Sequence, residues 1–209
     1  MSFLDRLVDA LAARPRARRS LTVAAVVLIA AAVATIAYPV YTDLYHDSLQ
    51  GRLARQLLAP STRQAYLDGR LKPGESLTRL QIPKLGVNVV VVQGVDAASL
   101  RAGAGHYPET PLPCQEGDVA IAGHRTTYGK PFANVDRLVP GDRILLTTPV
   151  GSCTYQVSRP PFVVLPDDWA VVANTPGEYE LTLTSCQPKG SASHRIVIKA
   201  SMISSTGSL

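Results

Sequence analysis

YELTLTSCQPKGSASHRIVIKAS, residues 179–201, is the stretch of sequence that decides the fold. Polar and apolar side chains alternate in its first part, YELTLTSC, and its last part, RIVIKAS, is rich in Ile, so both parts are typical of β-strands. The residues between them include Pro, Gly and Ser, which indicate a loop. The stretch therefore predicts a β-hairpin with Cys186 at the end of one strand and Arg195 at the start of the next.

Six further short β-rich runs precede this hairpin, separated by Gly, Pro, Asn and Asp. They are LTRLQIP (77–83), VNVVVVQGV (87–95), DVAIAGH (118–124), DRILLTTP (142–149), CTYQVSR (153–159) and FVVL (162–165). Eight runs in about 130 residues predict a sheet closed on itself or two packed sheets. We favour an all-β fold with minor helices, a compact barrel over residues 77–209, because the runs do not alternate regularly with helices as a parallel sheet requires.

An apolar run, LTVAAVVLIAAAVATIAY (21–38), contains no charged residue and no proline. At a rise of 1.5 Å per residue, a helix of this length covers most of a hydrocarbon core of about 30 Å, so we interpret it as a membrane span. Basic residues are retained in the cytoplasm. They precede the run, and acidic residues follow it: Arg14, Arg16, Arg18 and Arg19 before, Asp43 and Asp47 after.

This pattern predicts a single-pass protein of the cell membrane in four parts. We expect a cytoplasmic tail over 1–19, a transmembrane helix over 20–40, a helical stalk or linker over 41–76 and an extracellular domain over 77–209. A buried core helix is the first alternative, but the run has no polar face. A cleavable signal peptide is the second, and the long basic leader argues against it.

The composition excludes two classes of protein. Of the 209 residues, 46% are hydrophobic, which excludes a disordered chain. The net charge is +5, but four of the positive charges lie between Arg14 and Arg19, where membrane topology explains them. The sequence also lacks a basic stripe interleaved with aromatic residues and has no zinc-finger spacing. We therefore expect no nucleic-acid partner.

Three cysteines follow the span, so at least one thiol must remain unpaired within the chain. We expect Cys186 to be the free one. Cys114 and Cys153 can form a disulfide, because extracytoplasmic chains tolerate them. Such a bridge would stabilise the fold by about 3 to 4 kcal/mol. The sequence gives no distance between their Cα atoms, so it leaves the pairing open.

His124 ends the run DVAIAGH, as Cys186 ends YELTLTSC, and each residue is followed by a loop. An imidazole beside a thiol can remove its proton or stabilise the thiolate, and can then protonate a leaving amine. Arg195 adds a permanent cation able to bind an oxyanion or hold a substrate. The spacing alone indicates a Cys–His enzyme of undefined type, and an inert buried Cys186 is the alternative.

Three segments resemble the sortase family, in the right order. They are IPKLGVNVVVVQGVD, GDVAIAGHRTTYGKPFANVDRLVPGD and YELTLTSCQPKGSASHRIVIKA, and with the intervening strands they cover residues 77–200. The resemblance implies an eight-stranded β-barrel and no cofactor. It also implies that Cys186 is the nucleophile, that His124 is the acid and base, and that Arg195 binds the oxyanion or the substrate.

The activity that the resemblance implies is that of a membrane-anchored cysteine transpeptidase. Such an enzyme cleaves the Thr-Gly bond of a C-terminal sorting signal on a secreted protein and forms a thioester. It then passes the acyl group to an amine on a cell-wall precursor or a pilin subunit. Both the secreted substrate and a lipid-linked acceptor would be held at the membrane that anchors the enzyme.

Within the family, GAGHYPET, HRTTYGKPF and the loop CQPKGS look like class E, the housekeeping type of Gram-positive actinobacteria. That class prefers Ala to Pro at the second signal position, Leu-Ala-X-Thr-Gly over Leu-Pro-X-Thr-Gly. The resemblance maps this preference onto Tyr107, whose phenol could bond an amide N–H that proline lacks. Tyr128 and Ser185 complete the expected substrate-binding set, and simple packing is the alternative for both tyrosines. Gln187 stands where many class E members have His.

The remaining histidines are expected to lie outside the chemistry: His106 and His194 as structural or solvated residues, and His46 in contact with lipid headgroups or water. Three other functions stay open. One is a cysteine hydrolase on the same fold, and another is an anchored binding or redox module with Cys186 in a disulfide. The third, a zinc site at His124 and Cys186, is disfavoured because a nearby Arg195 would repel the ion. We therefore expect no metal.

Overall fold

The computed structural model describes residues 15–207 and divides the chain into two compact units, Met1–Tyr41 and Thr42–Leu209. Residues 1–14, most of the expected cytoplasmic tail, lie outside the described residues. The first unit contains the beginning of helix α2 (Pro15–Leu57). Among the described residues, α2 is the one helix long and apolar enough to cross a membrane, and none of its most apolar window is buried.

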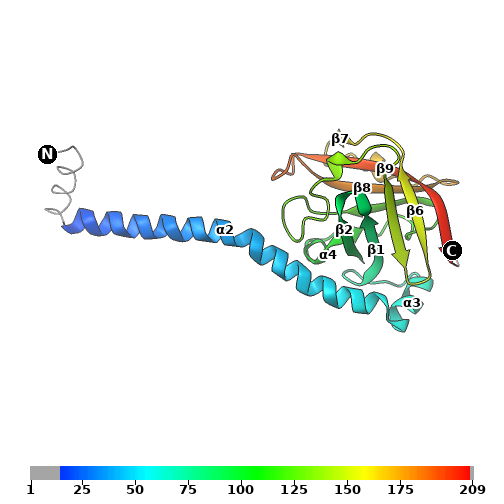
Figure 1. The fold of residues 1–209 in the computed structure, drawn as a ribbon, viewed down its shortest axis with the longest axis horizontal. Helices are drawn as coiled ribbons and strands as arrows, with labels where there is room; N and C mark the ends of the chain where they lie inside the picture. The colour runs from blue at the N-terminus through cyan, green and yellow to red at the C-terminus, as the bar shows by residue number, and fades with distance from the viewer. Residues whose placement is uncertain (1–14, 208–209) are drawn as a thin grey trace. The chain divides into compact units, whose positions relative to one another are not determined.

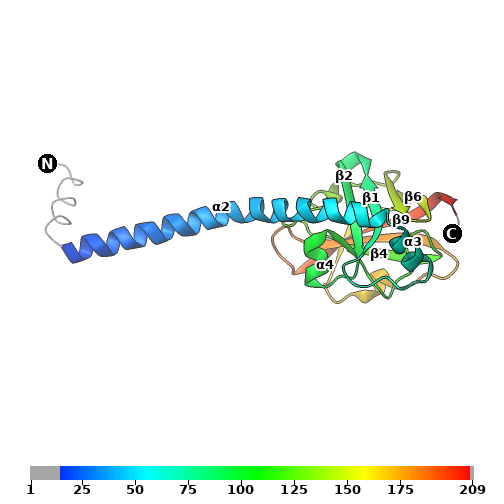
Figure 2. The ribbon, with the colours of Figure 1, turned by 90° about the horizontal axis from the view of Figure 1, so that it is seen from below.

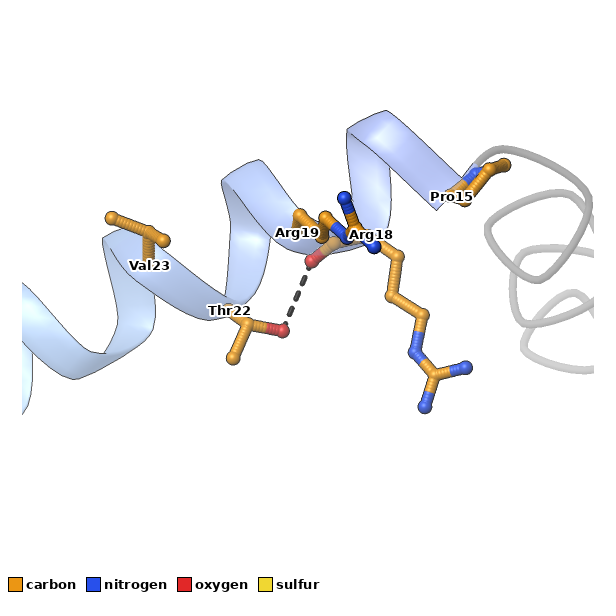
Figure 3. A pocket seen from close by; sticks show the side chains of 5 residues that line it. All are labelled: Pro15, Arg18, Arg19, Thr22 and Val23. Carbon is orange, nitrogen blue, oxygen red and sulfur yellow. Dashed lines mark hydrogen bonds between the residues drawn. The ribbon is translucent and has the colours of Figure 1, made fainter.

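The basic end of α2 is shown in Figure 3. The Thr22 hydroxyl donates to the Arg18 carbonyl at 3.0 Å, and the Arg18 and Arg19 side chains extend from the helix. With Pro15 and Val23, these residues line a hollow on one helix. The hollow contains none of the residues to which the sequence assigns chemistry.

The second unit is a closed β-barrel (Figure 1). Its strands are β1 (Ser76–Ile82), β2 (Val87–Gln93), β3 (Ala104–His106), β4 (Gly117–Ala122), β5 (Arg143–Thr148), β6 (Gly151–Val157), β7 (Phe162–Val164), β8 (Tyr179–Gln187) and β9 (His194–Gly207). The sheet order is β6-β5-β1-β2-β3-β4-β8-β9-β7, and β6 also pairs with β9. Eight strands therefore close the barrel, as expected, and β7 pairs with the first part of β9, on the edge that β6 occupies further along.

One barrel strand escapes prediction, and one predicted strand lies outside the closed ring. All eight β-rich runs form strands. The FVVL run becomes β7, which pairs only with β9. The barrel strand that was not predicted is β3, a three-residue strand that pairs parallel with β2 and antiparallel with β4. Three residues are too few for an alternating pattern to be recognised.

The barrel core contains inward-facing side chains from the strands and from the segment between β4 and β5. Its largest fully buried members are Tyr155, Phe132, Leu77, Leu80, Ile82, Ile121, Leu138, Ile144, Leu146, Leu181, Leu183 and Ile198. Each buried aliphatic side chain of this size contributes about 1.5 to 3 kcal/mol relative to an exposed one. The residues that alternate with these core members on β4, β8 and β9 point to the outer face of the barrel.

The segment expected to be a stalk packs against the barrel. Leu53 and Leu57 of α2 are buried against Val90 and Val92 of β2, and Figure 2 shows this part of α2 crossing β1 and β2. Gln50 fixes the contact, because its amide donates to the Val90 carbonyl at 3.0 Å and accepts from the Val90 N–H at 2.7 Å. The folded unit therefore begins at Thr42, well before the expected start at residue 77.

Short helices complete the second unit: α3 (Pro60–Leu67), α4 (Ala97–Ala102) and the 3₁₀ turns Pro83–Leu85, Val135–Arg137 and Trp169–Val172. The docking of α2 overturns the expectation for His46. Its side chain is 4% exposed, so it does not meet lipid headgroups or water. That expectation was wrong because the sequence does not reveal that this part of α2 lies against a loop of the barrel.

Candidate active site

The predicted hairpin is formed by β8 and β9, and its register puts Cys186 directly opposite Arg195. Side chains of opposite residues project from the same face, with Cβ atoms about 5 Å apart. Leu181 and Leu183 of β8 lie in the barrel core, so alternation directs Cys186 out of the barrel. Its thiol is free and half-buried.

His124 reaches the same level through the parallel pairing of β4 with β8. Ala122, the last residue of β4, is the partner of Thr184, and the Gly123 N–H donates to the Thr184 carbonyl at 3.1 Å. Two residues after Ala122 and Thr184 come His124 and Cys186. Neighbouring strands lie about 4.8 Å apart and a two-residue step preserves the face. The register therefore brings His124 and Cys186 to the same end of two adjoining strands.

Gly123, directly before His124, is held on two sides. A Cβ atom at Gly123 would lie 2.6 Å from the Phe132 ring, so a larger residue would displace this strand end. The Ser185 hydroxyl donates to the Gly123 carbonyl at 2.6 Å. Ser185 is buried, so its hydroxyl supports the strand end that precedes His124, and its expected substrate-binding role stays a prediction.

Arg125 is a site residue that the sequence reasoning missed. Its side chain is 3% exposed and forms an ion pair with Asp136. It also donates to the Gln187 side chain and to the Ala133 carbonyl. Because Arg125 follows His124 and Gln187 follows Cys186, this guanidinium ties together the two strand ends that carry the predicted acid-base and nucleophile. The motif AGHR contained the residue, but a buried role cannot be read from an arginine in a loop.

The electrostatics of the site favour a neutral imidazole. Burial lowers the pKa of His124 below its ordinary value of 6.5, because a desolvated ring resists protonation. The Arg195 guanidinium donates to the carbonyls of Ala192 and His194, both at 3.1 Å. These contacts hold the Arg195 side chain at the hairpin loop, and the strand register places Arg195 opposite Cys186.

Two tyrosines lie near the residues predicted to be catalytic. The Tyr107 hydroxyl lies 3.0 Å from the Thr184 hydroxyl, two residues before Cys186 and on the same face of β8. Its ring meets Trp169 edge to face, with centroids 6.5 Å apart. The Tyr128 ring lies 5.4 Å from the His124 ring. Both tyrosines therefore lie close to the predicted site residues. Tyr107 precedes His124 in the sequence, and Tyr128 follows it.

The loop that carries Tyr107 is tied to the barrel. Cys114 and Cys153 form a disulfide with their Cα atoms 5.7 Å apart, which joins this loop to β6. The Tyr66 hydroxyl of α3 donates to the Pro113 carbonyl at 2.6 Å. These two links restrict the loop on which Tyr107 depends.

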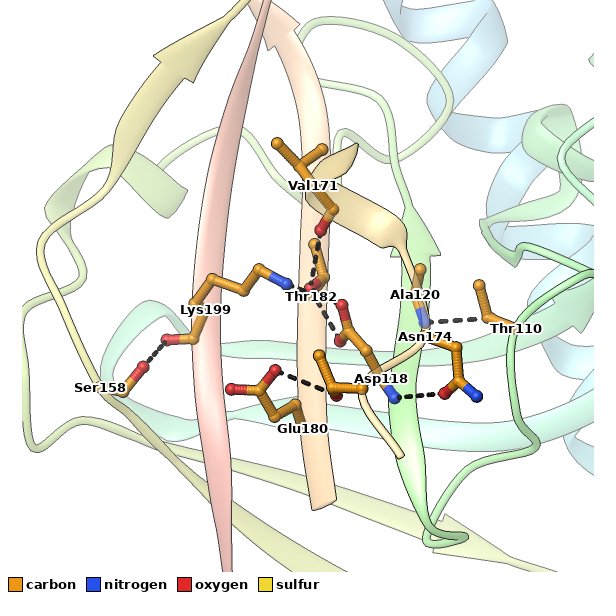
Figure 4. Close-up of polar contacts among 10 residues, drawn as sticks. Thr110, Asp118, Ala120, Ser158, Val171, Asn174, Glu180, Thr182 and Lys199 are labelled. Atoms are coloured by element: carbon orange, nitrogen blue, oxygen red, sulfur yellow. Dashed lines mark hydrogen bonds and ion pairs between the residues drawn. The ribbon is translucent and has the colours of Figure 1, made fainter. Parts of the chain in front are cut away.

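A buried ion pair joins Asp118 of β4 to Lys199 of β9 beside Thr182 of β8 (Figure 4). The Lys199 ammonium lies 2.7 Å from Asp118, and the Thr182 hydroxyl donates to the same carboxylate. Burial raises the pKa of Asp118, while Lys199 and Thr182 oppose that shift. The cluster joins β4, β8 and β9, the three strands whose ends carry His124 and the Cys186–Arg195 pair.

The two histidines other than His124 that lie outside α2 have structural or solvated positions. His106 is fully buried and its ring nitrogens meet the Gln93 amide and the Pro111 carbonyl. Burial lowers its pKa to about 4. His194 is exposed and contacts the Ser193 hydroxyl. Within residues 15–207, no group of three or more His, Cys, Asp and Glu side chains is arranged to hold a metal ion.

A barrel that presents a free thiol, a neutral imidazole and a guanidinium on the ends of three adjoining strands defines a cysteine enzyme of the acyl-transfer class. Residues 80–203 match the Sortase domain of the sortase family. The chain therefore belongs to the sortase family, as the sequence motifs predicted.

Curated and solved relatives agree with this assignment. Sortase D of Bacillus subtilis is 33% identical over 66% of this chain and 70% of its own length. Sortase SrtE1 of Streptomyces coelicolor is 31% identical over 65% of this chain, but the match spans only 42% of that protein. The structure of sortase E from Streptomyces avermitilis superposes with a TM-score of 0.60 and 34% identity, covering 65% of this chain and 93% of that one.

Proposed function

We propose that this protein is a membrane-anchored cysteine transpeptidase of the class E type. It cleaves a C-terminal sorting signal resembling Leu-Ala-X-Thr-Gly or Leu-Pro-X-Thr-Gly between Thr and Gly. It then transfers the secreted protein to an amine on a cell-wall precursor or a pilin subunit. The observation that carries the proposal is the register that pairs Cys186 with Arg195 on β8 and β9 while β4 brings His124 alongside.

The first half of the reaction forms a thioester. The Cys186 sulfur attacks the Thr carbonyl carbon after its proton passes to His124, whose lowered pKa leaves the ring free to accept it. Arg195 turns from its loop carbonyls to donate to the oxyanion of the tetrahedral intermediate. His124 then gives its proton to the departing Gly amine, and the acyl group remains on Cys186.

The second half of the reaction reverses these roles. An acceptor amine attacks the thioester carbonyl, His124 takes a proton from it, and the Cys186 thiolate leaves. An amide bond replaces the thioester, so the free energy of the original peptide bond is retained. Release to water, the hydrolase alternative, differs only in the attacking group, and product analysis separates the two.

Tyr107 is proposed to select the second signal residue. Its hydroxyl contacts Thr184, which lies two residues before Cys186 on the same face of β8. An extended peptide bound along that face would pass this hydroxyl. A phenol at this position can bond an Ala N–H, which a Pro residue lacks. We expect Tyr107→Phe to lose the preference for Leu-Ala-X-Thr-Gly over Leu-Pro-X-Thr-Gly while Cys186 stays reactive, as measured by kcat/KM for both peptides.

The proposed topology places the N-terminus in the cytoplasm and residues 42–209 outside the membrane. The apolar part of α2 supports an anchor, and the basic residues before it support this orientation. Protease added to intact spheroplasts should remove the C-terminal unit and leave an N-terminal tag protected. Protection of both ends would contradict the topology.

The activity itself is tested with full-length protein in detergent and both signal peptides, with and without an added amine such as diglycine. Mass analysis should find cleavage at Thr-Gly and, with diglycine, the ligated product. Cys186→Ala and His124→Ala should abolish both, and His194→Ala is the matched control that should not. Cleavage that never incorporates the amine would favour the hydrolase, and no Cys186-dependent cleavage would contradict the proposal.

A further inference from the structure

The loop that follows His124 contains three successive residues in the left-handed region of backbone space. Their φ angles are 51° at Tyr128, 70° at Gly129 and 39° at Lys130. Only glycine adopts this region without steric cost, so two of the three residues require outside support. Conformations of this kind persist where surrounding contacts impose them, and they concentrate at functional sites.

Part of that support comes from Asp43 on α2, which follows the apolar run by five residues in the sequence. One carboxylate oxygen accepts from the Gly129 N–H at 3.2 Å. The other forms an ion pair with the Lys130 ammonium at 2.9 Å. The Lys130 contact holds the pKa of Asp43 below its usual range, so the Asp43 carboxylate stays charged at neutral pH.

His46, one turn further along α2, supplies a second contact. Its buried ring packs so closely on Gly129 that a Cβ atom there would lie only 2.3 to 2.7 Å from the ring atoms. Gly129 is therefore required twice, by its φ angle and by the ring above it. Its position is determined by α2 as much as by the loop itself.

The clamped loop is in direct contact with His124. The Tyr128 ring lies 5.4 Å from the His124 ring, and the Phe132 N–H donates to the His124 carbonyl at 3.1 Å. The segment from His124 to Phe132 is thus a closed loop with the imidazole at its base. A displacement of Gly129 or Lys130 would be passed through Tyr128 to the imidazole.

We propose that Asp43 and His46 are positioning residues of the active site, by which the helix that leaves the membrane holds Tyr128 against His124. The inference rests on the proposed function of His124 as acid and base. It gives the segment Thr42–Leu57 a part in catalysis, in addition to its part in linking the barrel to the membrane.

The first test compares Asp43→Ala with Asp47→Ala in the full-length protein in detergent. Asp47 is an exposed carboxylate on the same helix that also faces His46, but no hydrogen bond or ion pair joins it to Gly129 or Lys130 among the described interactions. It is therefore the control for the two Asp43 contacts. With the signal peptide that the wild type cleaves, Asp43→Ala should lower kcat about tenfold with little change in KM, because small displacements of catalytic groups reduce rate more than binding. Asp43→Asn, which keeps an acceptor for the Gly129 N–H, should be intermediate.

A second readout does not depend on any peptide. The rate of Cys186 alkylation by iodoacetamide at pH 7 reports how well the imidazole supports the thiolate. It should fall severalfold in Asp43→Ala and stay at the wild-type value in Asp47→Ala, at a temperature well below the melting point of both. Equal kcat and equal alkylation rates in the two variants would overturn the inference even if both lost some thermal stability.

The second test uses Gly129→Ala alone and combined with His46→Ala. The single variant should lose activity, and the double variant should recover part of it, because removing the ring makes room for the new Cβ while the φ strain remains. No recovery would overturn the role of His46. If the wild type cleaves neither peptide but alkylation still separates Asp43→Ala from Asp47→Ala, the positioning stands and the proposed substrate fails.

Discussion

Replacing Arg125 with alanine should destabilise the barrel and disturb the junction between its two catalytic strand ends. The guanidinium is 3% exposed and has three partners: the Gln187 side chain, the Ala133 carbonyl at 3.3 Å and the Asp136 carboxylate. Removing it leaves Gln187 and Ala133 without their donor. Among the described interactions, an exposed hydrogen bond from Lys189 to Asn134 at 3.2 Å also joins the segments that follow Cys186 and His124, but Arg125 is the buried link.

The expected magnitude follows from these contacts. Hydrogen bonds from a charged donor contribute about 1.5 to 3 kcal/mol each when buried. The Asp136 side chain is 44% exposed, so solvent screens its ion pair and it adds at most about 1 kcal/mol. The Arg125 Nε is buried without a partner, and the mutation removes that cost. We therefore expect a loss of about 3 kcal/mol, a large share of the usual 5 to 15 kcal/mol.

The assay is urea unfolding of the full-length protein in detergent, followed by the fluorescence of Trp169 and by circular dichroism. Arg137→Ala, an exposed arginine on the adjacent 3₁₀ turn, is the control and should change stability by less than about 0.5 kcal/mol. In a double-mutant cycle, Arg125 and Gln187 should couple by at least about 1 kcal/mol. A coupling near zero, or an Arg125→Ala variant as stable as the control, would refute the reasoning.

Three further predictions concern the frame around the site. Reducing the Cys114–Cys153 bridge, or replacing both residues with serine, should cost about 3 to 4 kcal/mol in urea unfolding and leave Cys186 reactive. The pKa of His106 falls to about 4 on folding, so below pH 6.5 the unfolded chain binds a proton that the folded protein does not. Stability should drop by up to about 3 kcal/mol between pH 6.5 and 4, and His106→Asn should flatten that dependence in unfolding curves at several pH values. Asp118→Ala leaves the Lys199 ammonium without its carboxylate and should cost about 3 to 5 kcal/mol, a loss that adding Lys199→Met should partly restore by thermal melting.

Much of the fold could be predicted because alternating polarity and β-branched residues indicate strands. The hairpin from Tyr179 to Ser201 shows both signals, and the structure contains it, with Cys186 opposite Arg195. Strand β3 was missed because three residues carry no period. The docking of the helix after the apolar run was also missed, because Leu53 and Leu57 show no more than an ordinary helical spacing and their partners, Val90 and Val92, are distant in sequence.

Some residues of the candidate site could be predicted from the sequence, and others could not. Cys186, His124 and Arg195 could be proposed from residue type and position at strand ends, and the resemblance to the sortase family supplied their expected roles. Arg125 and Asp43 could not, because their roles depend on distances to Gln187 and Gly129 that only the folded chain defines. Charged residues in loops and helices are usually solvated, so nothing in their sequence positions singled them out.

The central claim is that Cys186 carries the acyl group of a cleaved signal, and hydroxylamine tests it most directly. The full-length protein in detergent is incubated with a Leu-Ala-X-Thr-Gly peptide and hydroxylamine, and the products are identified by mass. The account predicts a peptide hydroxamate ending at Thr, formed by the wild type and absent with Cys186→Ala. Formation of that product by Cys186→Ala, or cleavage at Thr-Gly without any hydroxamate, would contradict a thioester at Cys186.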